Sequence, residues 1–330
     1  MIDFHPIFAG KGVLITGGLG FIGSNLAHRL VELGAVVTIV DALFPECGGS
    51  YFNIAGIEDR VEVHILDIQD ESEMGRLVQE KAFVFNLAGR VSHLDSMRNP
   101  YADLESNVRG HLSLLEACRR HNPEAKIVYA GTRQVYGRPR YLPVDESHPP
   151  DPVDINGVHK LAGEWYHIVY HRVYGLHTVS LRLTNTYGPR MRVKDSRQTF
   201  IGWWVRQVVE GRELEIFGDG RQIRDFNYVD DVVEALLLAA ASPLADGQIY
   251  NLGGESISLL DLARLLTEVN GGGRYRLVPF PPERSRIDIG DYSGDYTRIR
   301  TQLGWQPKTP LREGLARTLA YYREHHSHYW

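Results

Sequence analysis

Short, uninterrupted apolar runs alternate along the first half of the chain with longer stretches whose apolar residues recur at helical spacing. Such runs are typical of parallel strands buried on both faces, and the longer stretches are typical of helices that pack on them. This alternation predicts an α/β fold with a doubly wound parallel sheet. The predicted strands are residues 13–15, 36–40, 61–66, 83–89, 126–131 and 177–183, and the clearest helices are residues 22–33, 103–120 and 156–174.

A glycine-rich turn separates the first predicted strand from the first helix. Gly17, Gly20 and Gly23 have the spacing G-x-x-G-x-x-G, which lets the chain fold back and lets a pyrophosphate approach the backbone. The helix that follows points its N-terminal amides at that phosphate. Asp41 ends the second strand, where a carboxylate can accept hydrogen bonds from both ribose hydroxyls and would repel a 2′-phosphate. The pattern therefore predicts a Rossmann-type site for NAD rather than NADP.

Further cofactor contacts are expected where the other strands end, because ligands bind beyond the carboxyl ends of such a sheet. Asp67 follows the third strand and can receive the adenine amino group, cap the next helix, or do both. Ala88 and Gly89 form a small-residue turn that lets the cofactor pass close to the backbone. Besides the three glycines and Asp41, the predicted cofactor contacts are Phe21, Ile22, Asp67, Ile68, Leu87, Ala88, Gly89 and Lys160.

The pattern changes from Thr184 onward. An irregular loop is followed by a helix, a pair of short strands around Gly218-Asp219-Gly220, and further amphipathic helices. We therefore predict an NAD-binding Rossmann domain at residues 1–183 and a smaller mixed α/β substrate domain at residues 184–330. The chain is expected to cross between the two near residues 225–255.

Composition narrows the function without identifying it. The chain has 330 residues, 43% of them hydrophobic, and a net charge of -5, which gives no electrostatic case for nucleic acid or a membrane surface. Cys47 and Cys118 are the two cysteines, and thiols this far apart favour a reduced, cytoplasmic compartment over a disulfide framework. The fourteen histidines are scattered, so we predict no metal site and interpret the C-terminal "HHSHYW" as a solvated tail.

Several motifs in the same order resemble the extended short-chain dehydrogenase/reductase family, the NAD-dependent sugar-nucleotide epimerases and dehydratases. They are "TGGLGFIG", "NLAG", "GTRQVYG", "NGVHKLAGE", "RLTNTYGPR" and "FGDGRQIRDFNYVDDVVEA", and the resemblance spans nearly the whole chain. It implies that the C-terminal half holds a nucleoside diphosphate sugar, which is oxidised to a transient ketone while NAD carries the hydride. The resemblance also implies Asn185, Arg224 and, more weakly, Arg286 as contacts to the diphosphate.

The family uses a tyrosine base with a lysine four residues later, one helical turn away, and a serine or threonine hydroxyl beside them. Thr132 and Lys160 match two of these positions, but the tyrosine position holds Asn156, and an amide is no general base. Either Lys160 itself, a nearby tyrosine (Tyr136 or Tyr166) or a bound water takes the proton, or the protein binds its ligands but turns over slowly or not at all. We favour retained catalysis, with Thr132, Lys160 and a water beside Asn156 sharing the proton.

The residues after Thr132 narrow the reaction. The family's 4,6-dehydratases have Asp-Glu there, whereas this chain has Arg133-Gln134, which cannot shuttle the proton for eliminating water. We therefore predict an epimerase. A reductase, decarboxylase or dehydratase of the same fold, and a non-catalytic NAD-binding protein, remain as alternatives. Arg133 either meets an anionic group on the sugar or forms a surface salt bridge.

Two predicted helices are apolar on more than their sheet-facing side, which indicates a further partner for them. The resemblance implies a homodimer formed through these helices as an intermolecular four-helix bundle. The residues that suggest it are Leu104, Leu112 and Leu114 in one helix and Leu161, Trp165, Ile168 and Val169 in the other.

Overall fold

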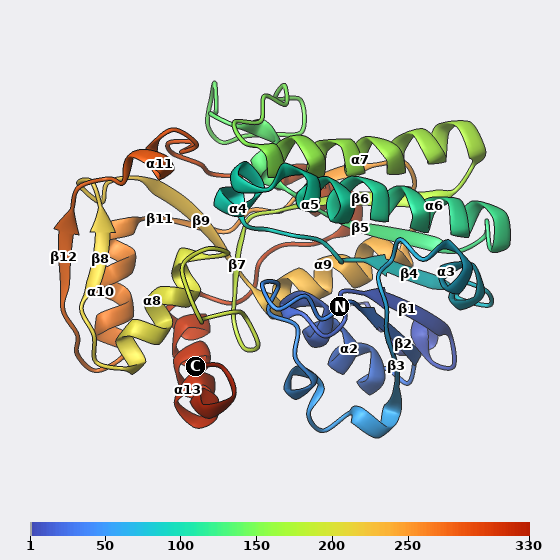
Figure 1. The fold of residues 1–330 in the computed structure, drawn as a ribbon, viewed down its shortest axis with the longest axis horizontal. Helices are drawn as coiled ribbons and strands as arrows, with labels where there is room; N and C mark the ends of the chain where they lie inside the picture. Colours follow the sequence, from blue (N-terminus) through green and yellow to red (C-terminus); the bar gives the residue numbers. More distant parts are fainter. Residues whose placement is uncertain (1) are drawn as a thin grey trace.

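The structure is a computed structural model that describes residues 2–330, and its largest element is a seven-stranded parallel sheet (Figure 1). The spatial order of the strands is β10-β6-β5-β4-β1-β2-β3. Because β1 lies between β2 and β4, the strand order reverses there, and a crevice opens beyond the carboxyl ends of these strands. The strands are β1 (Gly12–Thr16), β2 (Val36–Asp41), β3 (Val61–Ile65), β4 (Phe83–Asn86), β5 (Lys126–Thr132), β6 (His177–Leu183) and β10 (Ile249–Asn251).

Helices cover both faces of this sheet, as doubly wound topology requires. In Figure 1, α6 (Gly110–His121) and α7 (Ile155–Tyr174) lie side by side above the sheet, and α2 (Phe21–Glu32) and α9 (Val229–Ala241) lie below it. Neighbouring residues of β1 point to opposite sides, and both Leu14 and Ile15 have no exposed surface. Burial on both faces explains why the strands read as continuous apolar runs. The fold class predicted from the sequence is confirmed.

The second part of the molecule carries two small sheets, with order β11-β9-β7 in one and β12-β8 in the other. It stands at the left of Figure 1. Its strands are β7 (Asn185–Tyr187), β8 (Leu214–Phe217), β9 (Ile223–Tyr228), β11 (Glu255–Ser258) and β12 (Tyr275–Val278). Its helices are α8 (Phe200–Val209), α10 (Leu259–Val269), α11 (Pro282–Ser285) and α13 (Leu311–His325).

The chain returns to the large sheet after β9. Helix α9 packs against β5 and β6, and β10 pairs in parallel with β6, so residues 229–251 belong with the first part although they follow residue 183. Then β11 pairs with β9 and brings the chain back. Strand β10 has three residues, too short to stand out as an apolar run, and the sequence did not predict it.

The helix predicted at residues 103–120 is interrupted. It consists of α5 (Pro100–Leu104), a π-helical turn (Glu105–Arg109) and α6. Asn107 lies in that turn, and its Nδ2 donates to the carbonyl of Arg90 at 3.0 Å. The remaining helices are α1 (His5–Phe8), α3 (Glu71–Leu77), α4 (His93–Arg98) and α12 (Thr297–Leu303). Within residues 2–330, no helix has the length and apolar character needed to cross a membrane.

The C-terminal residues pack onto the protein, so the interpretation as a solvated tail is wrong. The ring of His328 stacks on Phe52 with centroids 3.6 Å apart, and the hydroxyl of Tyr329 donates to Asn53 Oδ1 at 2.7 Å. Aromatic rings of α13 surround this contact, including Tyr322, 5.2 Å from Tyr329. The five aromatic and histidine rings of this segment pack against other rings, which the polar character of the sequence does not indicate.

Candidate active site

A cavity of about 600 Å³ lies between the two parts of the molecule, beyond the carboxyl ends of β1, β2, β4 and β5. Its walls bring together every site residue predicted from the sequence except Arg286. The predicted residues that line it are Gly17, Gly20, Phe21, Ile22, Gly23, Asp41, Asp67, Ile68, Leu87, Ala88, Gly89, Thr132, Arg133, Asn156, Lys160, Asn185 and Arg224.

The glycine turn after β1 leaves room for a pyrophosphate. Gly17 has φ +70°, and a β-carbon there would lie 2.9 Å from the backbone of Ala88, so only glycine allows this approach. A β-carbon on Gly23 would overlap the carbonyl oxygen of Gly17. Helix α2 begins after Gly20 with no side chain capping its first amides, which leaves those donors free for an anion. This geometry fits the NAD predicted for the site.

Asp41 and Asp67 occupy the adenosine side of the cavity. Asp41 Oδ2 accepts from the amide of Leu19 at 3.0 Å and its Oδ1 from the amide of Leu43 at 2.9 Å, which fixes the carboxylate in place. Burial raises the pKa of Asp41, against the effect of these two amides. Asp67 accepts from the backbone of Gln69 at 3.0 Å, whereas Asp70 caps α3. Asp67 is therefore not the helix cap.

Lys160 lies on the inward side of α7, one turn after Asn156. It is 6% exposed, and burial lowers its pKa to about 8. A β-carbon on Gly89 would lie 2.7 Å from Lys160 Nζ and 2.5 Å from Asn107 Oδ1, so the lysine meets the turn after β4. Asn107 Oδ1 is buried and has no partner in the described part of the chain. These groups fit the nicotinamide ribose that the lysine position is expected to hold.

Asn156 lines the cavity, but its side-chain amide is hydrogen-bonded to other residues of the protein. Its Nδ2 donates to the carbonyl of Arg90 at 2.9 Å and to Asp103 Oδ2 at 3.0 Å, and the residue is 2% exposed. These bonds join the start of α7 to α5 and to the turn after β4. The Asn156 amide therefore stabilises the part of the cavity wall where the family has its tyrosine.

The two tyrosines considered as replacement bases do not line the cavity. Tyr136 is fully buried, donates to Asn251 Oδ1 at 2.7 Å and accepts from Arg182 at 2.6 Å. Burial raises its pKa to about 12. Tyr166 packs against the apolar core between the sheet and α6. Neither phenol is placed to take a proton from a substrate.

Positive charge gathers at the opposite end of the cavity. Arg133 Nη2 donates to Asn185 Oδ1 at 3.2 Å, while its Nη1 is buried with no partner among residues 2–330. Arg224 donates to Asp288 Oδ1 at 3.1 Å, and burial together with the nearby Arg133 lowers its pKa to about 10. Two neighbouring guanidinium groups, one of them incompletely paired, favour an anionic ligand.

Arg286 is exposed and lies outside the cavity, so the structure does not bring it to the other predicted residues. Arg284, two residues earlier, lines the cavity instead. The "PPERSR" segment contains both arginines, and the sequence gives no sign of which of them faces inward. Arg284, rather than Arg286, is therefore the arginine of this segment that lies in the cavity wall.

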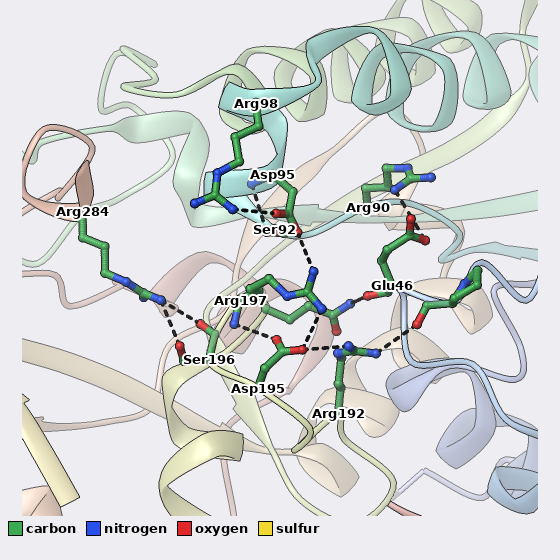
Figure 2. Close-up of polar contacts among 12 residues, drawn as sticks. Glu46, Arg90, Ser92, Asp95, Arg98, Arg192, Asp195, Ser196, Arg197 and Arg284 are labelled. Atoms are coloured by element: carbon green, nitrogen blue, oxygen red, sulfur yellow. Dashed lines mark hydrogen bonds and ion pairs between the residues drawn. The ribbon is translucent and has the colours of Figure 1, made fainter. Parts of the chain in front are cut away.

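The structure also adds a strap, residues 188–199, that runs from β7 to α8 along the cavity. Figure 2 shows Asp195 between Arg192 and Arg197, each 2.8 Å away, and Arg284 donating to Ser196 Oγ at 2.9 Å. Burial opposes ionisation of Asp195, but the two arginines outweigh it and hold its pKa well below the usual range.

The strap joins both parts of the molecule. Arg192 donates to the carbonyl of Pro45 at 3.2 Å, Gln198 donates to the carbonyl of Glu46 at 2.6 Å, and Arg197 lies 3.9 Å from Asp95 on α4. These three contacts each reach a residue more than a hundred positions away, so the sequence alone showed an irregular loop.

Comparison with known proteins places the chain in a family. Residues 13–253 match the NAD dependent epimerase/dehydratase family. A putative UDP-glucose 4-epimerase of Methanocaldococcus jannaschii is 33% identical over 312 residues, which cover 93% of this chain and 97% of that protein.

Two solved structures share the fold over nearly their full lengths. The UDP-glucose 4-epimerase of Thermotoga maritima, solved with UDP-glucose, has TM-score 0.87 and 33% identity, and covers 96% of this chain and 99% of its own. The Thermus thermophilus UDP-glucose 4-epimerase in complex with NAD has TM-score 0.84 and 31% identity, and the match covers 95% of this chain and 99% of that one. The chain belongs to the NAD-dependent epimerase/dehydratase family, whose members act on sugar nucleotides, and its cofactor is NAD.

Proposed function

We propose that this protein is an NAD-dependent epimerase that acts on a nucleoside diphosphate sugar through a transient keto intermediate. The observation that carries the proposal is one continuous cavity with a cofactor cradle at Gly17 and incompletely paired arginine at Arg133. Thr132 and Lys160 lie between these ends, where a nicotinamide and a sugar would meet. NAD, when bound, accepts a hydride from the sugar carbon and returns it.

The protein's own residues bind and orient the two ligands. Arg133 and Arg224 hold the diphosphate through paired donors. Beyond them, Phe217 and Phe280 lie with ring centroids 5.7 Å apart, and Arg284 stands 5.6 Å from the centre of the Phe217 ring. All of these residues line the cavity, and their flat faces suit a nucleobase. Lys160 holds the ribose hydroxyls, and the strap at residues 188–199 limits access of water.

Epimerisation is favoured over dehydration because acid and base groups are missing after Thr132. Gln134 Nε2 donates to Asp154 at 2.8 Å and its amide nitrogen donates to Thr132 Oγ1 at 3.2 Å, so this residue positions its neighbours. Neither an amide nor a guanidinium can deliver and remove the protons of a water elimination.

We also propose a homodimer formed through α5, α6 and α7. Leu104, Trp165 and Val169 are 38%, 44% and 42% exposed, respectively, on neighbouring helices. Leu114 and Ile168, also counted for this face from the sequence, point into the core instead. Light scattering of the protein at micromolar concentration should give a dimer, and Trp165→Asp should give a monomer; a monomeric unsubstituted protein would contradict the proposal.

The function is tested with a panel of sugar nucleotides, including UDP-glucose, UDP-N-acetylglucosamine, CDP-linked, dTDP-linked and uronic acid sugars. Absorbance should report transient NADH, and chromatography should report an epimer of at least one sugar. A product that has lost water or carbon dioxide would support the dehydratase or decarboxylase alternative. Binding of a sugar nucleotide without NADH or product would support the non-catalytic alternative, for which the loss of the tyrosine at Asn156 is the argument.

A further inference from the structure

A histidine–aspartate pair lies in the wall of the cavity, at the same end of α7 as Asn156. His93 is the first residue of α4 and lines the cavity, and Asp154 is the residue before α7. His93 Nδ1 lies 2.9 Å from Asp154 Oδ2. The two atoms are at ion-pair distance, although the contact does not meet the geometry of a hydrogen bond.

Asp154 is held firmly. Its Oδ1 accepts from the amide of Gly157 at 2.7 Å, its Oδ2 from Gln134 Nε2 at 2.8 Å, and its side chain has 0% exposed surface. Burial opposes ionisation, but His93, Gly157 and Gln134 outweigh it, so the pKa of Asp154 is lowered. The carboxylate therefore stays charged at neutral pH. Through Gln134 it is also connected to Thr132, whose Oγ1 accepts from the amide of Gln134.

The imidazole is oriented by this carboxylate. Nδ1 is buried against the carboxylate, whereas 36% of the side chain is exposed and His93 lines the cavity, which leaves Nε2 as the ring nitrogen available to a ligand. A carboxylate beside Nδ1 favours the tautomer with its hydrogen on Nδ1 and leaves the Nε2 lone pair free. The pair thus has the arrangement of a general base supported by an acid.

The other groups at this end of the cavity are less suited to accept a proton. Lys160, with its pKa at about 8, is mainly an ammonium ion at neutral pH. Asn156 already donates to Arg90 and Asp103, and Tyr136 lies outside the cavity. We propose that His93, positioned by Asp154, takes the place of the missing tyrosine as the general base and acid; this inference rests on the proposed function above.

Protons and electrons balance in the proposed reaction. The sugar hydroxyl gives its proton to His93 Nε2, the same carbon gives a hydride to NAD, and the C=O bond of the ketone forms. On the return step the carbonyl carbon recovers the hydride and the oxygen recovers the proton from the imidazolium. Lys160 keeps its charge throughout and stabilises the developing oxyanion, while Thr132 donates a hydrogen bond to it.

The test compares His93→Ala and Asp154→Ser with His177→Gln, using the sugar nucleotide that the unsubstituted protein turns over. Serine keeps the helix cap but cannot hold the imidazole. His177 forms a similar pair, its Nδ1 being 2.7 Å from Asp246 Oδ2, but it lies outside the cavity, so its variant controls for loss of a surface histidine. We expect kcat to fall about 10²–10⁴-fold in His93→Ala with NAD affinity retained, and to stay unchanged in His177→Gln.

Added imidazole should restore at least a tenth of the lost rate in His93→Ala and none in Lys160→Met. Asp154→Ser should lower kcat with little change in KM. Failure of imidazole rescue, or a His93→Ala rate within threefold of the control, would overturn the role of His93 while leaving the epimerase proposal intact. Absence of turnover by the unsubstituted protein on the whole panel would instead overturn the proposed function, and the general base with it.

The tautomer of the His93 imidazole can be measured without a sugar substrate. Nitrogen NMR of histidine-labelled protein, with His93→Ala to assign the signal, should show the Nδ1–H tautomer for neutral His93, and Asp154→Ser should lose that preference. An Nε2–H tautomer in the unsubstituted protein would contradict the proposal whatever the enzyme turns over.

Discussion

The cofactor end of the cavity draws its defining contacts from one continuous segment, residues 12–41, whereas the sugar end collects Thr132, Asn185 and Arg224 from separate elements. The first end is held by backbone geometry: a glycine turn, free helix amides and an acid fixed by two amides. The second end is held by side-chain contacts: Arg133 with Asn185 and Arg197 with Asp95 join the two parts of the molecule. Arg224 pairs with Asp288 within the second part. The backbone geometry of the first end suits one cofactor. Because the second end depends on individual side chains, its substrate and its proton path can change while the cofactor site stays the same.

Lys160 stands where the two ends meet, so its replacement should affect both. Lys160→Met removes a cation beside the turn after β4, and we expect kcat to fall about 10³-fold and NAD to bind more weakly. Stopped-flow absorbance and fluorescence titration with NAD measure the two effects. Lys11→Met, at an exposed site, is the control. Loss of turnover with NAD affinity unchanged would assign Lys160 to the sugar end alone.

The same substitution should stabilise the protein without ligands. Burial lowers the pKa of Lys160 in the fold from 10.5 to about 8, so its charge destabilises the folded state by about 3 kcal/mol at most. That cost is complete below pH 8 and disappears as the pH rises toward 10.5. Urea unfolding of Lys160→Met should show its largest gain at pH 7 and almost none at pH 10.5. A gain that does not depend on pH would point to packing instead.

Substitution of Arg133 should weaken binding at the sugar end of the cavity without weakening binding at the cofactor end. Arg133→Gln removes a guanidinium whose buried Nη1 has no partner among the described residues, and we expect the Kd of UDP or UDP-glucose to rise about tenfold to a hundredfold. The Kd of NAD should change less than twofold, because the glycine turn and Asp41 are untouched. Calorimetry on the same preparations measures both. Equal weakening of both ligands would show that the two ends are coupled rather than independent.

The smallest effect is expected for the choice between the two nicotinamide cofactors. Asp41 has no neighbouring lysine or arginine in the sequence to receive a 2′-phosphate, so NAD should bind at least about tenfold more tightly than NADP. In Asp41→Asn the charge is lost while the shape is kept, and this preference should narrow. Equal or tighter binding of NADP by the unsubstituted protein would remove the argument from Asp41.

The comparison also explains what the sequence could predict. The pattern at residues 12–41 is local, so spacing was enough to identify the turn, the helix and Asp41. The six longer strands followed from their apolar runs, but β10, with three residues, gave no such signal. His93 and Asp154 are 61 positions apart, and their contact depends on how α4 meets α7. Likewise, whether Arg284 or Arg286 faces the cavity depends on the position of α11 against the strap, which no local pattern specifies.

The segment around Tyr329 is connected to the adenosine side of the cavity, although the two lie far apart in the sequence. The hydroxyl of Tyr329 donates to Asn53, the side chain of Asn53 donates to the carbonyl of Leu19, and the amide of Leu19 donates to Asp41. Tyr329 is thus connected by three hydrogen bonds to the acid expected to hold the ribose. Tyr329→Phe removes the first of these bonds, so its effect on NAD affinity measures how far this connection supports Asp41.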